Sequence, residues 1–234
     1  MKRTILSIAL AGTLLVSGCW KDTPKTIVVL VDATMSVDPT EYERCRRELE
    51  RVTQALGRGD RVVLVPITGE PQELLGHRIV HIQMPAERVP YESNLKKAKA
   101  EAAKRIEEFL AGLPGIQAKR TDIIGALRAT ADAFRPDHSE LLCFSDMVED
   151  DPEVSFLKAR ELNNAKAAEV LAERLAQRDM LHGVVVKVGI LKSFDLERMN
   201  SARRDAVQAF WRKYFHASGA SNVRITVDLT TLGD

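Results

Sequence analysis

The chain has 234 residues, and its 34 lysines and arginines against 33 aspartates and glutamates give a formal net charge of +1. A balance this close to neutral provides no strong field toward nucleic acid or toward an anionic membrane surface. The length is enough for one domain with a well-filled core.

The first residues predict a secretion signal that is not part of the fold. Lys2 and Arg3 precede an apolar stretch over residues 5–16. This length fits the hydrophobic region of a signal peptide and falls short of the roughly 20 residues that a transmembrane helix needs. Small residues lead directly into Cys19. The segment resembles the lipobox of bacterial lipoproteins, in which the cysteine is lipidated and becomes the new N-terminus. An ordinary secretion signal with a chance cysteine is the alternative.

The lipobox resemblance implies a place in the cell. Several acyl chains on one cysteine anchor a protein stably, since two already suffice. Residue 20 is Trp rather than Asp, which under the enterobacterial sorting rule favours the outer membrane, facing the periplasm. We therefore expect a lipid-anchored protein on the extracytoplasmic side of a bacterial cell envelope. The expected division is a signal peptide over residues 1–18, a lipidated N-terminus with a short tether over 19–25, and one folded domain over 26–234.

After the tether, apolar strands alternate with amphipathic helices almost without interruption. Strands are expected over residues 27–31, 61–68, 78–84, 141–144, 183–191 and 223–229. Helices are expected over residues 42–56, 95–109, 122–136, 156–178 and 195–216. This alternation indicates an α/β fold, in which a doubly wound, mostly parallel six-stranded sheet carries helices on both faces. One short strand is expected to be antiparallel.

Polar side chains follow two of the expected strands. Asp32, Thr34 and Ser36 come directly after the first apolar run, and Asp146 comes at the end of the fourth. Thr121 lies in a loop immediately before a helix. The carboxyl ends of parallel strands form the edge where such sheets bind ligands. Carboxylates with neutral hydroxyls suit a hard divalent cation that prefers oxygen.

These three segments resemble those of von Willebrand factor A domains. The family's metal-ion-dependent adhesion site has Asp-x-Ser/Thr-x-Ser after the first strand, a threonine in a loop before a helix, and an aspartate after the fourth strand. Asp32-x-Thr34-x-Ser36, Thr121 and Asp146 follow that order. Thr34 stands where serine is commoner, and this change keeps the hydroxyl.

The resemblance implies a function. Thr34, Ser36 and Thr121 would offer hydroxyl oxygens to Mg²⁺, with Mn²⁺ as the alternative, while Asp32 and Asp146 would hold coordinated waters. An acidic side chain from a partner protein would complete the coordination sphere. The expected function is therefore a protein-binding module, for adhesion or for assembly of an envelope complex, and not an enzyme.

Two other interpretations stay open at this point. A haloacid-dehalogenase-like phosphatase would use Asp32 as its nucleophile, and some of these enzymes read Asp-x-Thr-x-Thr/Ser there. Against it, Thr121 does not end an apolar strand, and no lysine lies just before the strand that leads to Asp146. The third interpretation is a von Willebrand factor A scaffold that no longer binds metal.

Three further features have competing interpretations. Cys45 and Cys143 are expected as buried apolar side chains, and a disulfide between them is the alternative in an oxidising compartment. The aromatic run over residues 210–215 is expected in the core, with a partner-facing helix as the alternative. The acidic residues 149–151 are expected to cap the helix that follows them, although they lie where they could influence partner choice.

Overall fold

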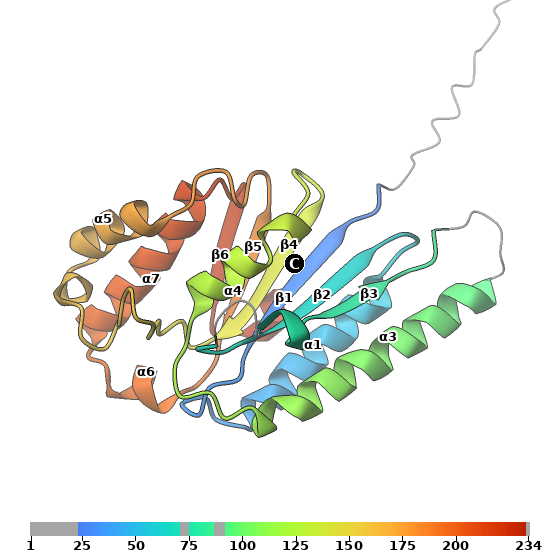
Figure 1. The fold of residues 1–234 in the computed structure, drawn as a ribbon, viewed down its shortest axis with the longest axis horizontal. Helices are drawn as coiled ribbons and strands as arrows, with labels where there is room; N and C mark the ends of the chain where they lie inside the picture. Colours follow the sequence, from blue (N-terminus) through green and yellow to red (C-terminus); the bar gives the residue numbers. More distant parts are fainter. Residues whose placement is uncertain (1–22, 71–74, 87–91, 233–234) are drawn as a thin grey trace, which may run out of the picture.

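The structure is a computed structural model that describes residues 23–70, 75–86 and 92–232 (Figure 1). The expected signal peptide over residues 1–18 and the expected lipidation site Cys19 lie outside the described residues. In the described part of the chain, no helix is both long enough and apolar enough to cross a membrane.

Six strands form one sheet in the order β3-β2-β1-β4-β5-β6. The strands are β1 (Thr26–Asp32), β2 (Arg61–Ile67), β3 (Val80–Gln83), β4 (Ser139–Ser145), β5 (Val185–Ile190) and β6 (Asn222–Thr226). All neighbouring pairs are parallel except β2 and β3. The expected α/β fold, with a mostly parallel six-stranded sheet and one short antiparallel strand, is confirmed.

Helices cover both faces of this sheet. The α-helices are α1 (Glu41–Ala55), α3 (Glu92–Gly112), α4 (Ile123–Ala129), α5 (Ala165–Leu175), α6 (Phe194–Arg198) and α7 (Ser201–Ala217). Short 3₁₀ turns are η1 (Gly76–Arg78), η2 (Leu113–Gly115), η3 (Ala131–Ala133), η4 (Arg160–Asn163) and η5 (Leu229–Thr231). The helices α1 and α3 lie side by side at one end of the molecule, and α5 and α7 pack together at the other (Figure 1).

The central strand β1 separates two hydrophobic cores. Because successive side chains of a strand point to opposite faces, Val28 and Leu30 enter the core under α4, α5 and α7, whereas Val29 and Val31 enter the core under α1 and α3. All seven residues of β1 are buried. The unbroken apolar run of the sequence therefore reflects a strand that is covered on both faces.

The two cysteines belong to different cores. Cys45 lies on the buried side of α1 and packs on one face of the sheet, and Cys143 of β4 packs on the other face. Both are buried and free. The sheet lies between them and keeps their Cα atoms farther apart than the roughly 7 Å that a disulfide allows. The alternative of a Cys45–Cys143 bridge is therefore wrong.

Three helices are shorter than the periodicity predicted. The segments 122–136, 156–178 and 195–216 form α4 with η3, η4 with α5, and α6 with α7. Polar side chains inside these segments hydrogen-bond to backbone groups, and each marks the point where a helix ends or begins. The Thr130 hydroxyl donates to two carbonyls in the last turn of α4. The side chains of Asn164 and Asn200 accept from N–H groups in the first turns of α5 and α7, as N-caps do.

The aromatic run on α7 is part of the core. Phe210, Trp211, Tyr214 and Phe215 are buried, and Phe156 packs edge-on against Phe210 with ring centroids 4.7 Å apart. The alternative of a partner-facing aromatic helix is therefore wrong.

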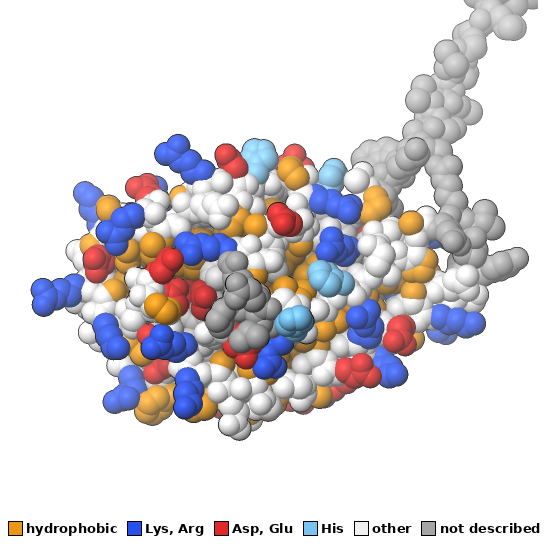
Figure 2. All heavy atoms as spheres, in the orientation of Figure 1, with side chains coloured by type: hydrophobic (Ala, Val, Ile, Leu, Met, Phe, Trp, Pro, Cys, Tyr) orange, Lys and Arg blue, Asp and Glu red, His pale blue; other side chains and the backbone are white. Residues whose placement is uncertain are grey.

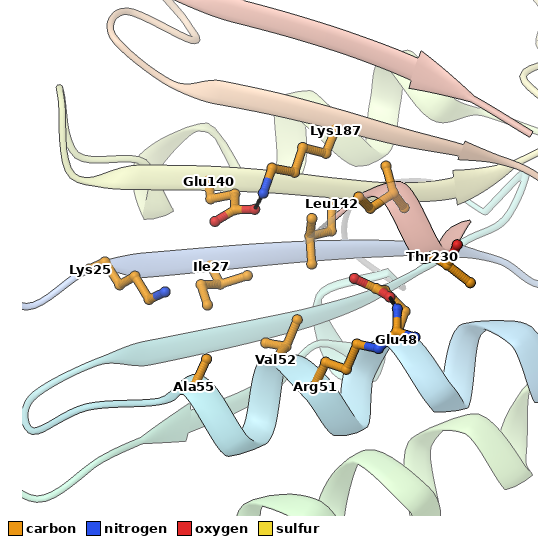
Figure 3. A pocket seen from close by; sticks show the side chains of 11 residues that line it. Lys25, Ile27, Glu48, Arg51, Val52, Ala55, Glu140, Leu142, Lys187 and Thr230 are labelled. Carbon is orange, nitrogen blue, oxygen red and sulfur yellow. Dashed lines mark hydrogen bonds and ion pairs between the residues drawn. The ribbon is translucent and has the colours of Figure 1, made fainter. Parts of the chain in front are cut away.

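A hollow lies on the α1 side of the sheet (Figure 3). It has a volume of about 390 Å³ and lies over the first halves of β1, β4 and β5, beside α1 and η5. Its charges are largely paired, since Lys187 binds Glu140 at 2.9 Å and Arg51 binds Glu48 at 2.7 Å. On the face drawn in Figure 2, basic and acidic side chains are interspersed across the described surface. The hollow over β1, β4 and β5 is thus a charge-balanced surface away from the carboxyl edge of the sheet.

Candidate functional site

The strand β1 delivers Asp32 to the carboxyl edge of the sheet, where it is fully buried. Its Oδ1 accepts the Thr34 hydroxyl at 2.6 Å and the Thr34 N–H at 3.0 Å. The Thr34 hydroxyl also lies 3.0 Å from the Ser36 hydroxyl. The structure therefore brings the first three predicted site residues together, with the carboxylate orienting the hydroxyls.

The loop after β4 places Asp146 beside them. The Ser145 hydroxyl donates to Asp32 Oδ2 at 2.6 Å and accepts the Met147 N–H at 2.9 Å. The backbone turns sharply at Met147, which has a φ of 62°, a left-handed conformation that few L-residues adopt. The Trp211 indole N–H fixes this turn by donating to the Met147 carbonyl at 2.8 Å. The buried Asp146 directly precedes this turn.

One oxygen of Asp146 has no hydrogen-bond partner among the described residues. Oδ1 accepts a hydrogen bond from the Val148 N–H at 2.8 Å, whereas the buried Oδ2 accepts no hydrogen bond from a described residue. The Ser193 hydroxyl lies close enough to favour the charged form of Asp146, but it makes no hydrogen bond of normal geometry with Oδ2. A buried carboxylate oxygen without a partner is costly unless a water or an ion occupies the space in front of it.

The third loop, which carries Thr121, is bonded to both of the others. The Met35 N–H donates to the Ala118 carbonyl at 3.0 Å, and the Asp150 N–H donates to the Thr121 carbonyl at 2.8 Å. Thr121 is buried. The three loops that carry the five predicted site residues are therefore neighbours at one edge.

Glu149 is a buried residue whose position the sequence did not reveal. Its carboxylate accepts the N–H groups of Ile123 and Ile124, each at 3.1 Å. It therefore caps α4, which precedes it in the chain, and the expectation that residues 149–151 cap the following helix is wrong for this residue. The carboxylates of Glu149, Asp122 and Asp151 have oxygens within 4.8 Å of one another. Burial raises the pKa of Glu149 well above its usual value, and the neighbouring acids raise this pKa further.

A fourth loop, between β5 and α6, also reaches the site and was missed. The Phe194 N–H donates to the Ser36 carbonyl at 3.0 Å, and Val37 pairs with Ser193 in an isolated β-bridge. The charge of Asp195 raises the pKa of both Asp32 and Asp146. The sequence could have predicted this loop, because it follows a parallel strand. Ligands bind at the carboxyl ends of such strands, and the same rule predicted Asp32 and Asp146.

The two central carboxylates lack a positive partner. Burial raises the pKa of Asp32. Burial, followed by the charge of Asp32, raises the pKa of Asp146 to about 7. In the parts of the chain that the structure describes, no ion pair joins either carboxylate to a lysine, arginine or histidine. The site thus concentrates negative charge and hydroxyl oxygens in a buried place, the donor set that a hard divalent cation prefers.

Comparisons with known proteins place these observations in context. No protein-family model matches the chain, and no curated protein sequence matches it. Solved structures give matches, among them "von Willebrand factor type A from Catenulispora acidiphila", with 11% identity and a TM-score of 0.41. Others are the human COPII-coat protein Sec24c, with 11% identity and a TM-score of 0.45, and the manganese-loaded TRAP protein of Plasmodium vivax, with 13% identity and a TM-score of 0.37.

The lengths of these proteins differ from that of the chain. The matches cover 84%, 88% and 82% of this chain, but only 42%, 30% and 73% of the respective structures. At identities and TM-scores this low, the likenesses carry no argument of their own. The α/β fold rests on the strand order and pairing, and the site rests on its own hydrogen bonds.

Proposed function

We propose that the chain is a divalent-cation-dependent protein-binding module, lipid-anchored through Cys19 in a bacterial cell envelope. The observation that carries the metal site is the buried pair Asp32 and Asp146, which has no cationic partner among the residues that the structure describes and leaves Asp146 Oδ2 without a hydrogen bond from any of them. A cation would offset the cost of burying two like charges.

The five residues fit Mg²⁺, with Mn²⁺ as the alternative. Thr34, Ser36 and Thr121 would offer hydroxyl oxygens, and Asp32 and Asp146 would hold coordinated waters, because Mg²⁺ keeps several waters when it binds to proteins. The bound ion would supply positive charge at a buried edge and accept an acidic side chain of a partner protein. The chain's own residues orient the hydroxyls and exclude bulk water around them.

A binding role is supported over catalysis by what surrounds Asp32. Both of its side-chain oxygens accept hydroxyl hydrogen bonds, from Thr34 and Ser145, and the side chain is fully buried. The carboxylate is therefore held inside the edge of the sheet and is not exposed to a substrate. Hydrolysis of an aryl phosphate that is lost in Asp32→Asn would contradict this part of the proposal.

Thermal unfolding of the full-length protein in detergent tests the metal site. An ion that binds only the folded state stabilises it by about 2.7 kcal/mol at 100 times its Kd, so Mg²⁺ or Mn²⁺ should raise the Tm above that in chelator. Ser36→Ala removes one half-buried ligand and should abolish most of this rise. Ser201→Ala, an exposed serine on α7, is the matched control. Equal Tm values with metal and with chelator would refute the metal site.

Lipid anchoring needs a separate experiment. Expression in a bacterium should yield a chain that begins at Cys19, carries acyl chains by mass spectrometry and sediments with membranes. The Cys19→Ser variant should appear in the soluble fraction. An unmodified cysteine on the processed wild-type chain would contradict the anchor and leave the metal site untouched.

A further inference from the structure

Two adjoining hollows form a groove beside the candidate metal site. The outer hollow has a volume of about 460 Å³ and runs from Arg44 on α1 to Ser193 and α6. The inner hollow, of about 190 Å³, lies between α6, α7 and β6 and reaches Asp146. The two hollows share Ile190, Leu196, Arg204 and Val227. We call this continuous surface the α6–α7 groove.

The inner end of the α6–α7 groove is apolar. Most of its lining residues are apolar: Met147, Ile190, Leu196, Val207, Trp211, Ile225 and Val227, beside the polar Asp146, Arg204 and Gln208. An apolar cavity of about 150 Å³ is large enough to hold benzene. The inner hollow therefore has room for one large apolar side chain, placed next to the Asp146 loop.

Positive charge lies along the outer end. Arg44, Lys192 and Arg204 line it, with Glu197 as the acidic residue among them. Arg44 is paired with Glu41. Neither Lys192 nor Arg204 forms an ion pair with a residue that the structure describes. The groove therefore offers two cationic groups to a ligand.

Exposed apolar side chains gather around the same edge. Among the described residues, the large hydrophobic side chains that are exposed are Met35, Leu157, Val170, Phe194 and Val227. Met35 lies between two predicted metal ligands, Phe194 is bonded through its N–H to Ser36, and Val227 lines the groove. Single exposed apolar residues are ordinary, but a group of them beside a concave surface indicates an interaction site.

We propose that the α6–α7 groove binds a protein segment that carries one large apolar side chain close to acidic residues. The apolar side chain enters the inner hollow, and the acidic groups face Arg204, Lys192 and the bound cation. This inference rests on the proposed function for the role of the cation and adds the chemistry of the partner. The chain's own described N-terminus enters β1 at the end of that strand opposite the candidate site (Figure 1).

A random dodecapeptide library displayed on phage provides the probe. Selection on the immobilised full-length protein in detergent with Mg²⁺ should enrich peptides that have a large apolar residue within a few positions of Asp or Glu. Replacing either the apolar residue or the acid in a synthetic copy should weaken binding about tenfold or more, as expected for a central anchor. Enriched peptides without this pairing would overturn the proposal.

Matched variants locate the binding surface. Arg204→Glu and Val227→Ser should each weaken the selected peptide about tenfold or more, because one reverses a charge and the other removes an apolar side chain that lines both hollows. The controls are Arg212→Glu, an exposed arginine on the same helix, and Val170→Ser, an exposed apolar residue on α5. Both controls should bind like the wild type. Equal binding by all four variants would overturn the groove.

The same measurements separate the groove from the metal site. Binding that is lost in Ser36→Ala or in chelator, yet unchanged in Arg204→Glu and Val227→Ser, refutes the groove and supports the metal site. Binding that depends on the groove residues but not on Mg²⁺ supports the groove and refutes the metal-dependent function. A dimer in analytical ultracentrifugation that Arg204→Glu dissociates would assign the groove to a second copy of the chain and overturn the proposed partner.

Discussion

Ser145 links the two acidic loops of the site through one hydroxyl group. The hydroxyl donates to Asp32 Oδ2 and accepts from the Met147 N–H, so its proton and one lone pair are both used. Removal of this group would leave two buried polar atoms without partners. The geometry of the edge therefore depends on a side chain that would not itself touch the ion.

We predict that Ser145→Ala lowers the free energy of unfolding in chelator by about 1–3 kcal/mol, the usual cost of a buried polar group left unpaired. The stabilisation by Mg²⁺ should also fall, because Asp32 loses a hydrogen bond that orients it. Urea unfolding with and without Mg²⁺ measures both quantities, with Ser201→Ala as the exposed control. An unchanged midpoint in chelator would show that the 2.6 Å contact contributes nothing.

The titration of Asp146 gives a second residue-level prediction. The pKa of this group is about 7 in the folded chain and 3.8 in the absence of burial. Between these values the folded state binds more protons than the unfolded state, so the metal-free protein should lose stability as the pH rises from about 4 to 7. The slope is at most about 1.4 kcal/mol per pH unit for one proton.

Metal should reverse this trend, because a cation binds the deprotonated carboxylate. The rise in Tm caused by Mg²⁺ should therefore grow between pH 5 and 8. Asp146→Asn should make the metal-free profile less steep, with the raised pKa values of Asp32 and Glu149 accounting for the slope that remains. Asp205→Asn, at an exposed position on α7, should leave the profile unchanged. A metal-free stability that increases with pH over this range would contradict the assignment.

At the scale of elements, Glu149 joins the loop after β4 to the first turn of α4. Without Glu149, the N–H groups of Ile123 and Ile124 would be buried and unpaired. Because Thr121 lies two residues before this turn, the cap also fixes the third loop of the site. The acidic loop and the short helix therefore form one unit.

We predict that Glu149→Ala destabilises the chain by about 1–3 kcal/mol and weakens Mg²⁺ binding in addition. Glu153→Ala is the control, since Glu153 is exposed and contacts Arg128 at a distance of 3.4 Å. Calorimetric titration with Mn²⁺, below the unfolding temperature of each variant, separates lost affinity from lost stability. Wild-type affinity in Glu149→Ala would limit its role to stabilising the fold.

The sequence predicted the strands well and the helix ends poorly, for physical reasons. Unbroken apolar runs such as residues 27–31 are visible because both faces of the strand are buried. Asn164 and Asn200 look like surface positions within a periodic stretch, although each begins a helix. The contact between Ser145 and Asp32 spans 113 residues, so it depends on which strands are neighbours. The order of the motifs predicted five site residues, but the hydrogen-bond partners of these residues could be identified only from the fold.

At the scale of the whole molecule, one sheet divides the interior into two separate cores. Cys45 lies in one core and Cys143 lies in the other. Burial raises the pKa of Cys45 to about 12 and raises the pKa of Cys143 well above its usual value. Neither thiol is therefore a thiolate at neutral pH.

We predict that neither thiol reacts with Ellman's reagent until the chain unfolds, because reaction needs an accessible thiolate. Two thiols should react per unfolded chain if Cys19 is lipidated, and three if it is not. Reducing agent should leave the Tm unchanged, since Cys45 and Cys143 form no disulfide. Rapid reaction of either thiol in the native protein would contradict the sealed cores.

The direction of β1 has a consequence for how the protein would stand in the envelope. This strand has seven residues and spans about 23 Å at roughly 3.3 Å per residue. The tether precedes one end of the strand, and the candidate cation site and the α6–α7 groove lie at the other. An acyl anchor on Cys19 would therefore be attached to the chain at the end of β1 opposite the recognition edge. In that arrangement, the protein would meet partners arriving from the aqueous space of the envelope rather than neighbours diffusing within its own leaflet.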